Sequence, residues 1–207
     1  MTIYFHEKDI PNDIEFKGSV AIDTETMGLK TYRDRLCLVQ ISAGNGDAHI
    51  LKIDNTKLIT TQKYTNLKKI LKNKKLLKIF HFARFDLAAL NFYVCKVEGN
   101  VWCTKIASKL SRTYTNKHGL SDLIRELLSI EISKEQQSSN WGRKIISTEQ
   151  KRYAANDVLN LHKLKEKLEA LLLQENRIEL AEKVFSFLKV RVELDLAGFE
   201  DLDIFAH

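Results

Sequence analysis

Two carboxylates stand two residues apart in the segment 20–29, which reads VAIDTETMGL. The run begins with apolar and β-branched residues, which predicts a strand that ends near Gly28. Because strand side chains alternate between the two faces of a sheet, Asp23 and Glu25 point to the same side. Adjacent anions near a core cost free energy unless positive charge neutralises them, and a divalent cation held by oxygen ligands does this. An isolated pair of this kind favours two solvent-exposed acids at the end of a strand, so a metal site requires matching carboxylates elsewhere in the sequence.

A third acid, Asp86, falls in the first turn of a helix predicted over 83–92, directly after an apolar strand at 76–80. The helix dipole favours an acid at this position without any function. The position also lies close to the end of a central strand, where open α/β sheets tend to place their sites. Asp86 is therefore a candidate partner for the first two acids.

The fourth acid, Asp157, shares one face of a helix predicted over 147–174 with Tyr153, four residues earlier. The same face continues with four leucines that indicate a core-facing stripe, Leu161, Leu164, Leu168 and Leu171. The small Ala154 and Ala155 would let this helix approach the sheet closely. A buried Asp with no basic partner within one turn needs compensation, and a metal ion supplies it.

The elements that must position these residues follow from the hydrophobic period. Strands are predicted at 20–28, 36–41, 49–53 and 76–80, after an extended lead-in over 1–18. Helices are predicted at 64–72, 83–92, 101–110, 120–128, 147–174 and 178–190. This order favours a mixed α/β sheet with helices on both faces. We expect a single domain over 1–207, with residues 191–207 as a C-terminal tail.

Composition restricts the class of protein. The chain has 207 residues, 44% of them hydrophobic, and only one proline, which is typical of a globular domain. No apolar run approaches the roughly 20 residues that span a bilayer, and 1–18 lacks the apolar centre of a signal peptide. We therefore expect a soluble, cytoplasmic protein that does not use a membrane. The three cysteines lack C-x-x-C spacing and are expected to be reduced thiols, not a zinc site.

The net charge of +6 is compatible with a polyanionic partner but does not identify one. Seven lysines form a basic stretch over 63–78: Lys63, Lys68, Lys69, Lys72, Lys74, Lys75 and Lys78. This stretch is either an approach surface for nucleic acid or an ordinary solvated face. The solvated face is favoured, because no exposed aromatic residues alternate with the lysines.

The three acidic motifs, in this order, resemble the DEDD exonuclease superfamily, and the Tyr of Tyr-x-x-x-Asp is typical of its DEDDy branch. The likeness is closest to ribonuclease D and to the short single-domain bacterial exoribonucleases called nano-RNase C. It extends to RDRLCLVQ at 33–40, WGR at 141–143, YAAND at 153–157 and the C-terminal runs ELDL and DIFAH. The chain departs from many relatives at Phe82, where they carry Asn, and is too short for the additional helical domains of ribonuclease D.

The resemblance implies a ribonuclease H-like fold with a mixed five-stranded sheet flanked by helices. It also implies two divalent cations, Mg²⁺ or Mn²⁺, about 3.5–4 Å apart, which suit phosphodiester hydrolysis. Asp23 would bridge both ions, Glu25 and Asp157 would complete one site, and Asp86 would hold the second. Tyr153 would orient or help deprotonate the attacking water.

For the substrate, the family pattern places Thr26 near the terminal 3′-hydroxyl and Leu29 between the last two bases. The alternative for Leu29 is core packing. His81 and Trp141 are candidates for contact with phosphate or base, with ordinary packing as the alternative for each.

The predicted function is a metal-dependent 3′–5′ exoribonuclease that releases nucleoside 5′-monophosphates from short RNA, dinucleotides included. The likeness suggests a ring-like homo-oligomer, such as an octamer. The apolar residues of the tail fit either docking on their own domain or contact with a neighbour. An exonuclease that acts on DNA or trims longer structured RNA is the alternative, because the sequence identifies no reader of the 2′-hydroxyl. A catalytically inactive nucleic-acid-binding scaffold is the alternative from another class.

Overall fold

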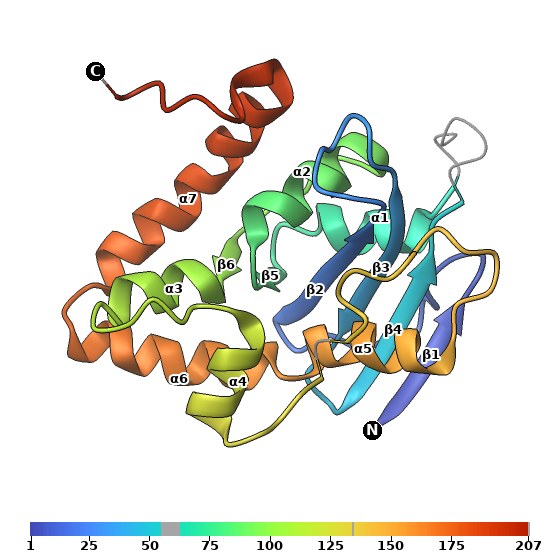
Figure 1. Ribbon diagram of the computed structural model, residues 1–207, viewed down its shortest axis with the longest axis horizontal. Helices are drawn as coiled ribbons and strands as arrows, with labels where there is room; N and C mark the ends of the chain where they lie inside the picture. Colours follow the sequence, from blue (N-terminus) through green and yellow to red (C-terminus); the bar gives the residue numbers. More distant parts are fainter. Residues whose placement is uncertain (55–62, 134, 207) are drawn as a thin grey trace.

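A mixed sheet of six strands forms the centre of the computed structural model, which describes residues 1–54, 63–133 and 135–206. The strand order is β1-β4-β3-β2-β5-β6, with β3 antiparallel to its neighbours and the other pairs parallel (Figure 1). The strands are β1 (Thr2–His6), β2 (Ser19–Thr26), β3 (Leu36–Ser42), β4 (Asp47–Lys52), β5 (Leu77–Phe80) and β6 (Val101–Cys103). The prediction of a mixed α/β fold is confirmed, but the sheet has six strands instead of five.

Seven α-helices are described around this sheet: α1 (Thr65–Lys72), α2 (Ala83–Tyr93), α3 (Thr104–Ser111), α4 (Leu120–Leu128), α5 (Thr148–Leu159), α6 (Leu161–Gln174) and α7 (Ile178–Leu194). A short π-helical turn, η1 (Asp195–Phe199), continues α7. Helix α5 packs across β1 to β4, whereas α6 packs on α3, α4 and α7 (Figure 1). No helix in the described ranges is both long and apolar enough to cross a membrane.

Two parts of the sheet differ from the prediction. Residues 2–6 are not a lead-in but an edge strand that pairs with β4, 45 residues later. Residues 101–103 are not the start of a helix but strand β6, which lies parallel to β5. In both cases the extended conformation is stabilised by pairing with a distant strand, which a local hydrophobic pattern does not report.

The helix predicted over 147–174 is two helices that meet at Asn160. Helix α5 ends at Leu159, and the backbone of Asn160 (φ −103°, ψ −3°) lies between the two helices. The break lets α5 follow the sheet while α6 follows the other helices. Leu161, Leu164 and Leu168 are buried as predicted, whereas beyond them Leu172 is buried in place of Leu171.

The basic stretch is not a continuous surface. Lys78 is fully buried in β5, where its Nζ donates to the carbonyl oxygens of Asn73 (2.5 Å) and Glu98 (2.6 Å). Burial, together with the charge of Lys189, lowers the pKa of Lys78 to about 8. Lys78 is therefore unavailable to a nucleic acid, and the prediction for this lysine is wrong.

The positions of the three cysteines agree with thiols packed inside the fold. Cys37 and Cys103 are buried, Cys95 is half-buried, and all three are free.

Substitution of Gly99, just before β6, tests how closely the backbone at this position packs against the backbone of Lys74. We expect Gly99→Ala to lower the free energy of unfolding by about 1–3 kcal/mol, because it forces an L residue into a left-handed conformation against backbone. The φ of Gly99 is +78°, and a Cβ would lie 2.8 Å from the backbone of Lys74. Urea unfolding would measure the change. Gly18→Ala is the matched control, because its φ is +79° but no atom lies within 4 Å of its Cβ. Equal losses in the two variants would contradict this account.

Candidate active site

Three of the acids selected from the sequence meet where β2 ends. Asp23 and Glu25 lie on the same face of β2, and Asp157 comes from α5, which packs on that strand. One carboxylate oxygen from each of these three residues lies within 4.8 Å of the other two. Ala154 and Ala155 are fully buried, so α5 does approach the sheet closely, as their small size predicted.

Asp86 reaches the same place from the other face of the sheet. It stands in the first turn of α2 and is 2% exposed. Thr24, which alternation directs away from Asp23 and Glu25, donates its hydroxyl proton to Asp86 Oδ1 over 2.7 Å. The strand therefore contributes to the site from both faces, and the four acids surround its carboxyl end.

A β-bulge accompanies this arrangement. The pairing of β2 with β3 shifts register between Glu25 and Thr26. Such irregularities are frequent beside active sites, because they redirect the chain. Here the bulge directs the chain out of the sheet into the connection over 27–35.

The four acids perturb one another strongly. Burial raises the pKa of Asp23, and the charges of Asp86, Asp157 and Glu25 raise it further. Burial raises the pKa of Asp86 to about 7, against the effect of the Thr24 hydrogen bond, and raises that of Asp157, helped by Asp86, to about 8. Burial and Asp157 also raise the pKa of Glu25. Within the described ranges no Lys, Arg or His forms an ion pair with these acids, so a bound cation would relieve the repulsion.

Tyr153 lies beside the acids and packs against Trp141. The two ring centroids are 5.9 Å apart with an interplanar angle of 38°, and Trp141 is 3% exposed. Burial raises the pKa of Tyr153, as do the charges of Asp157, Glu25 and Asp23. The phenol therefore keeps its proton at neutral pH and can donate a hydrogen bond.

The loop that carries Trp141 is held by the start of α5. Ser147 and Gln150 form a capping box, in which each side chain accepts from the backbone N–H of the other. The Gln150 amide nitrogen also donates to Ser139 Oγ (2.9 Å) and to the Asn140 carbonyl (3.3 Å). The helix that positions Tyr153 and Asp157 thereby also fixes the position of Trp141.

The acids line a cleft of about 670 Å³ that also includes all four candidate substrate residues. Leu29 is 80% exposed, so its alternative as a core residue is excluded. Thr26 Oγ1 donates to the Gly28 carbonyl over 2.5 Å. His81 is half-buried, and its Nδ1 lies 2.8 Å from the Thr104 hydroxyl. Burial, with the charge of Lys105, lowers the pKa of His81 to about 3, so the ring is neutral.

Lys105, which the sequence analysis did not select, lines the cleft together with Phe82, the position where the chain departs from many relatives. The Lys105 ammonium lies 4.2 Å from the centroid of the Phe82 ring, which is 46% exposed. Lys105 is the one cation among the described residues that line the cleft, and no lysine of the basic stretch lines it. A correct prediction of β6 would have identified Lys105, because parallel β5 and β6 end at the same edge of the sheet.

Comparison with known proteins agrees with this geometry. A profile of the 3′–5′ exonuclease family matches residues 2–173. Ribonuclease D from Jannaschia sp. (strain CCS1) is 30% identical over 159 residues, which are 76% of this chain and 40% of that protein. The chain thus spans about two fifths of the length of this curated relative.

Solved structures resemble the whole chain. Brucella melitensis NrnC bound to pGG is 50% identical, with a TM-score of 0.94 over 100% of this chain and 99% of that one. The same Brucella protein with bound Mg²⁺ is also 50% identical, with a TM-score of 0.92 and complete coverage of both chains. Escherichia coli RNase D, at 20% identity and a TM-score of 0.72 over 84% of this chain and 45% of its own, shares the fold.

Metal-free protein should lose stability as the pH rises from about 7 to 8. Histidines are largely neutral in both states in this range, whereas the raised pKa values of Asp86 and Asp157 mean that these acids bind more protons in the native state than in the unfolded state, so the free energy of unfolding falls with pH. Mg²⁺ or Mn²⁺ should restore it at pH 8 by at least about 1 kcal/mol, or roughly 3 °C in Tm. Thermal unfolding in EDTA and in each metal at pH 7 and 8 measures this. Asp157→Asn should weaken both responses, and a Tm in EDTA that does not fall with pH would contradict the electrostatic account.

Proposed function

The chain belongs to the 3′–5′ exonuclease family, and on that premise we propose that it hydrolyses short RNA, dinucleotides included, to nucleoside 5′-monophosphates. Its relatives confirm the predicted resemblance to ribonuclease D and to nano-RNase C (NrnC). The chain is therefore a nuclease. The observation that carries the proposal is the group of carboxylate oxygens from Asp23, Glu25 and Asp157 on the wall of the cleft.

The residues present fit a divalent cation, and we propose that the site holds two. Their ligand atoms are carboxylate oxygens, the donors that Mg²⁺ and Mn²⁺ prefer, and within the described residues no protein cation competes for them. Asp23 would contact both ions, Glu25 and Asp157 one, and Asp86 the other. When bound, two such ions would increase the acidity of the attacking water and offset charge on the phosphate and the leaving 3′-oxygen.

The remaining steps fall to this chain's own side chains. Tyr153, with its protonated phenol, orients the water by donating or accepting one hydrogen bond. Thr24 holds Asp86 in one orientation through its hydroxyl. Trp141 packs on Tyr153 and reduces the freedom of that ring. These side chains therefore contribute to catalysis mainly by holding the reacting groups in position, and less by transferring protons.

The proposed substrate length rests on the loop that carries Leu29 and on the solved structures that resemble this chain. Leu29 stands exposed at the cleft, as a residue that separates two terminal bases would, and Thr26 also lines the cleft. The Brucella NrnC, which matches this chain over its full length, was solved with pGG. We propose ligands of that size for this chain. DNA, trimming of longer structured RNA, and an inactive nucleic-acid-binding scaffold are the competing functions.

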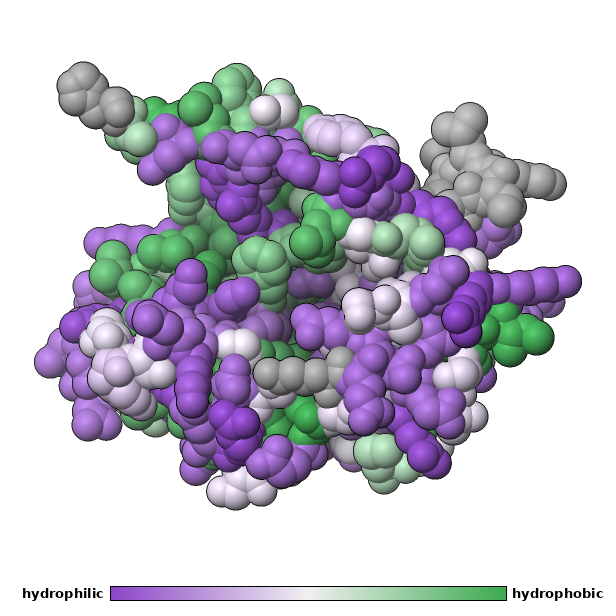
Figure 2. Space-filling model, viewed as in Figure 1, coloured by the Kyte–Doolittle hydropathy of each residue, from purple (hydrophilic) through white to green (hydrophobic). Residues whose placement is uncertain are grey.

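Homo-oligomerisation, such as an octameric ring, forms part of the proposal, together with a cytoplasmic location. Apolar side chains of the C-terminal residues stay exposed in the single chain: Phe199, Leu202, Ile204 and Phe205 are 42%, 55%, 43% and 77% exposed. Apolar side chains also gather over α7 and this end of the chain in Figure 2. Exposed apolar groups of this extent favour contact with another copy.

Product release from 5′-labelled RNA of two, seven and twenty nucleotides tests the function. We expect mononucleotide release with Mg²⁺ or Mn²⁺, none with EDTA, and the highest kcat/KM on the dinucleotide. Asp23→Ala should lower the rate by at least about 10³-fold, because the shared ligand of both ions is lost. Tyr153→Phe should lower it by about 10²-fold with KM nearly unchanged.

Each other outcome selects a different function. Faster cleavage of the twenty-mer would keep the chemistry but move the role to trimming of longer RNA. Equal cleavage of a matched DNA would remove the RNA preference. No release with either metal, together with no Mn²⁺ binding by calorimetry, would leave the scaffold.

Light scattering coupled to size-exclusion chromatography tests assembly. We expect a mass several times 23.9 kDa for the native chain. Leu202→Ser with Phe205→Ser should shift it toward the monomer, since the apolar contact is removed. Lys8→Ser, on a part of the chain remote in sequence from the tail, serves as the control. A monomer at every concentration would refute the oligomer.

A further inference from the structure

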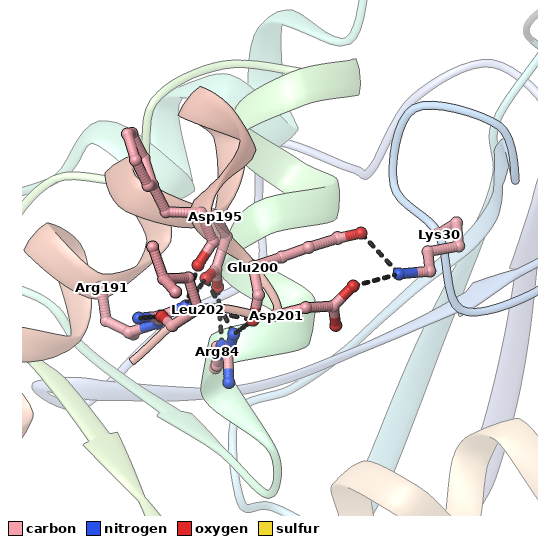
Figure 3. A network of polar contacts seen from close by, with 8 residues as sticks. Lys30, Arg84, Arg191, Asp195, Glu200, Asp201 and Leu202 are labelled. Carbon is pink, nitrogen blue, oxygen red and sulfur yellow. Dashed lines mark hydrogen bonds and ion pairs between the residues drawn. The ribbon is translucent and has the colours of Figure 1, made fainter. Parts of the chain in front are cut away.

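The first turn of α2 is tied to the far end of the chain. Arg84 Nε and Nη2 donate to the two carboxylate oxygens of Asp195 over 2.7 and 2.8 Å, and Nη2 also donates to the Glu200 carbonyl over 2.7 Å (Figure 3). Asp195 is only 7% exposed, so this bidentate pair is largely shielded from water. Arg84 stands two residues before Asp86, between two residues that line the cleft.

The residues 195–201, which we call the C-terminal segment, have a second anchor on α7. Arg191 Nη2 contacts Asp195 Oδ1 over 2.7 Å and donates to the carbonyls of Phe199 (2.6 Å) and Glu200 (3.2 Å) (Figure 3). Gly198, with φ of +96°, permits the turn that brings these carbonyls back toward the arginines. The C-terminal segment is thus held firmly against α2 and α7.

From this fixed base, the C-terminal segment reaches the opposite side of the cleft. Lys30 Nζ donates to Glu200 Oε1 over 2.6 Å and to Asp201 Oδ2 over 3.1 Å (Figure 3). Lys30 directly follows Leu29, the exposed residue at the cleft. The C-terminal segment therefore connects the α2 side of the cleft with the Leu29 side.

The rest of the 28–34 loop is held elsewhere. Asp34 accepts from the backbone N–H of Lys30 over 2.9 Å, and the Tyr93 hydroxyl on α2 donates to the Thr31 carbonyl over 2.8 Å. These contacts fix the backbone that follows Leu29. The ion pairs of Lys30 hold the side of the loop nearest to Leu29.

We propose that the C-terminal segment is a clamp that positions Leu29 relative to α2, with Lys30, Glu200, Arg84 and Asp195 as positioning residues for short RNA. This inference rests on the proposed function, because it assigns the clamp a part in substrate selection. When the clamp is open, the loop spends a smaller fraction of time in the binding-competent position. The apparent KM rises in proportion, while the chemistry at the acids is unchanged.

Charge exchange at Lys30 and Glu200 tests the clamp. We expect Lys30→Glu to raise KM for a dinucleotide about 3- to 10-fold with kcat within about 2-fold, and the double variant Lys30→Glu with Glu200→Lys to recover at least half of the loss. Glu200→Lys alone separates the clamp from general attraction of RNA. The clamp predicts weaker binding for this variant, whereas general attraction predicts tighter binding because positive charge is added.

Lys96→Glu is the matched control, because Lys96 forms an exposed ion pair of 2.7 Å with Glu193 on α7 without touching the loop. Its KM should stay within 2-fold of the native value. Arg84→Gln should loosen the same clamp from its other end, so its effect on KM should not add to that of Lys30→Glu. Additive effects, or tighter binding by Glu200→Lys, would overturn the proposal.

A second readout separates failure of the clamp from failure of the proposed function. Hydrogen exchange at the amides of residues 28–35 should accelerate in Lys30→Glu and Glu200→Lys, slow again in the double variant, and accelerate in the native chain at 0.5 M salt. Unchanged exchange in all variants would refute the clamp even if RNA is cleaved. Native protein that cleaves no RNA but shows this exchange pattern would refute the proposed function and keep the clamp.

Discussion

Mutual repulsion among four carboxylates at the end of β2 is the constraint on which the rest of the arrangement depends. At neutral pH these groups would separate or take up protons, because burial raises the pKa of all four and the charges of neighbouring acids raise those of Asp23, Glu25 and Asp157 further. The fold resists separation by attaching them to its most rigid parts. A central strand carries two acids, and two helices that pack closely against the sheet carry the others.

The position of β2 explains why such a site is stable enough to exist. The strand pairs with β3 over Ala21–Thr26, the part that carries the acids, and with β5 over Ser19–Ala21, and every residue of β3 is buried. Carboxylates on a surface loop would relax by moving apart, whereas these would have to disrupt a packed sheet. The hydrophobic core therefore offsets the electrostatic cost of the site and keeps one carboxylate oxygen each of Asp23, Glu25 and Asp157 within 4.8 Å of the other two.

The sequence alone was sufficient to predict the site residues that lie on these rigid elements. A period of two placed Asp23 and Glu25 on one face, and a period of about four placed Tyr153 with Asp157. The sequence was insufficient where pairing with a distant strand decided the structure, as for the edge strand β1 and the three-residue strand β6. Because β6 was not predicted, Lys105 was not recognised as a cleft residue. The contact of Thr24 with Asp86 was also out of reach, because it depends on α2 lying on the opposite face of the sheet.

The proposed chemistry and the proposed substrate selection thus lie in parts of the molecule with different physical properties. The acids sit on buried elements, where small displacements are costly, while Leu29 and Lys30 belong to a surface loop held partly by exposed ion pairs. Such pairs contribute little to folding but bias the position of the residues they join. Substitutions in the loop or the C-terminal segment can therefore change which substrates fit without disturbing the core.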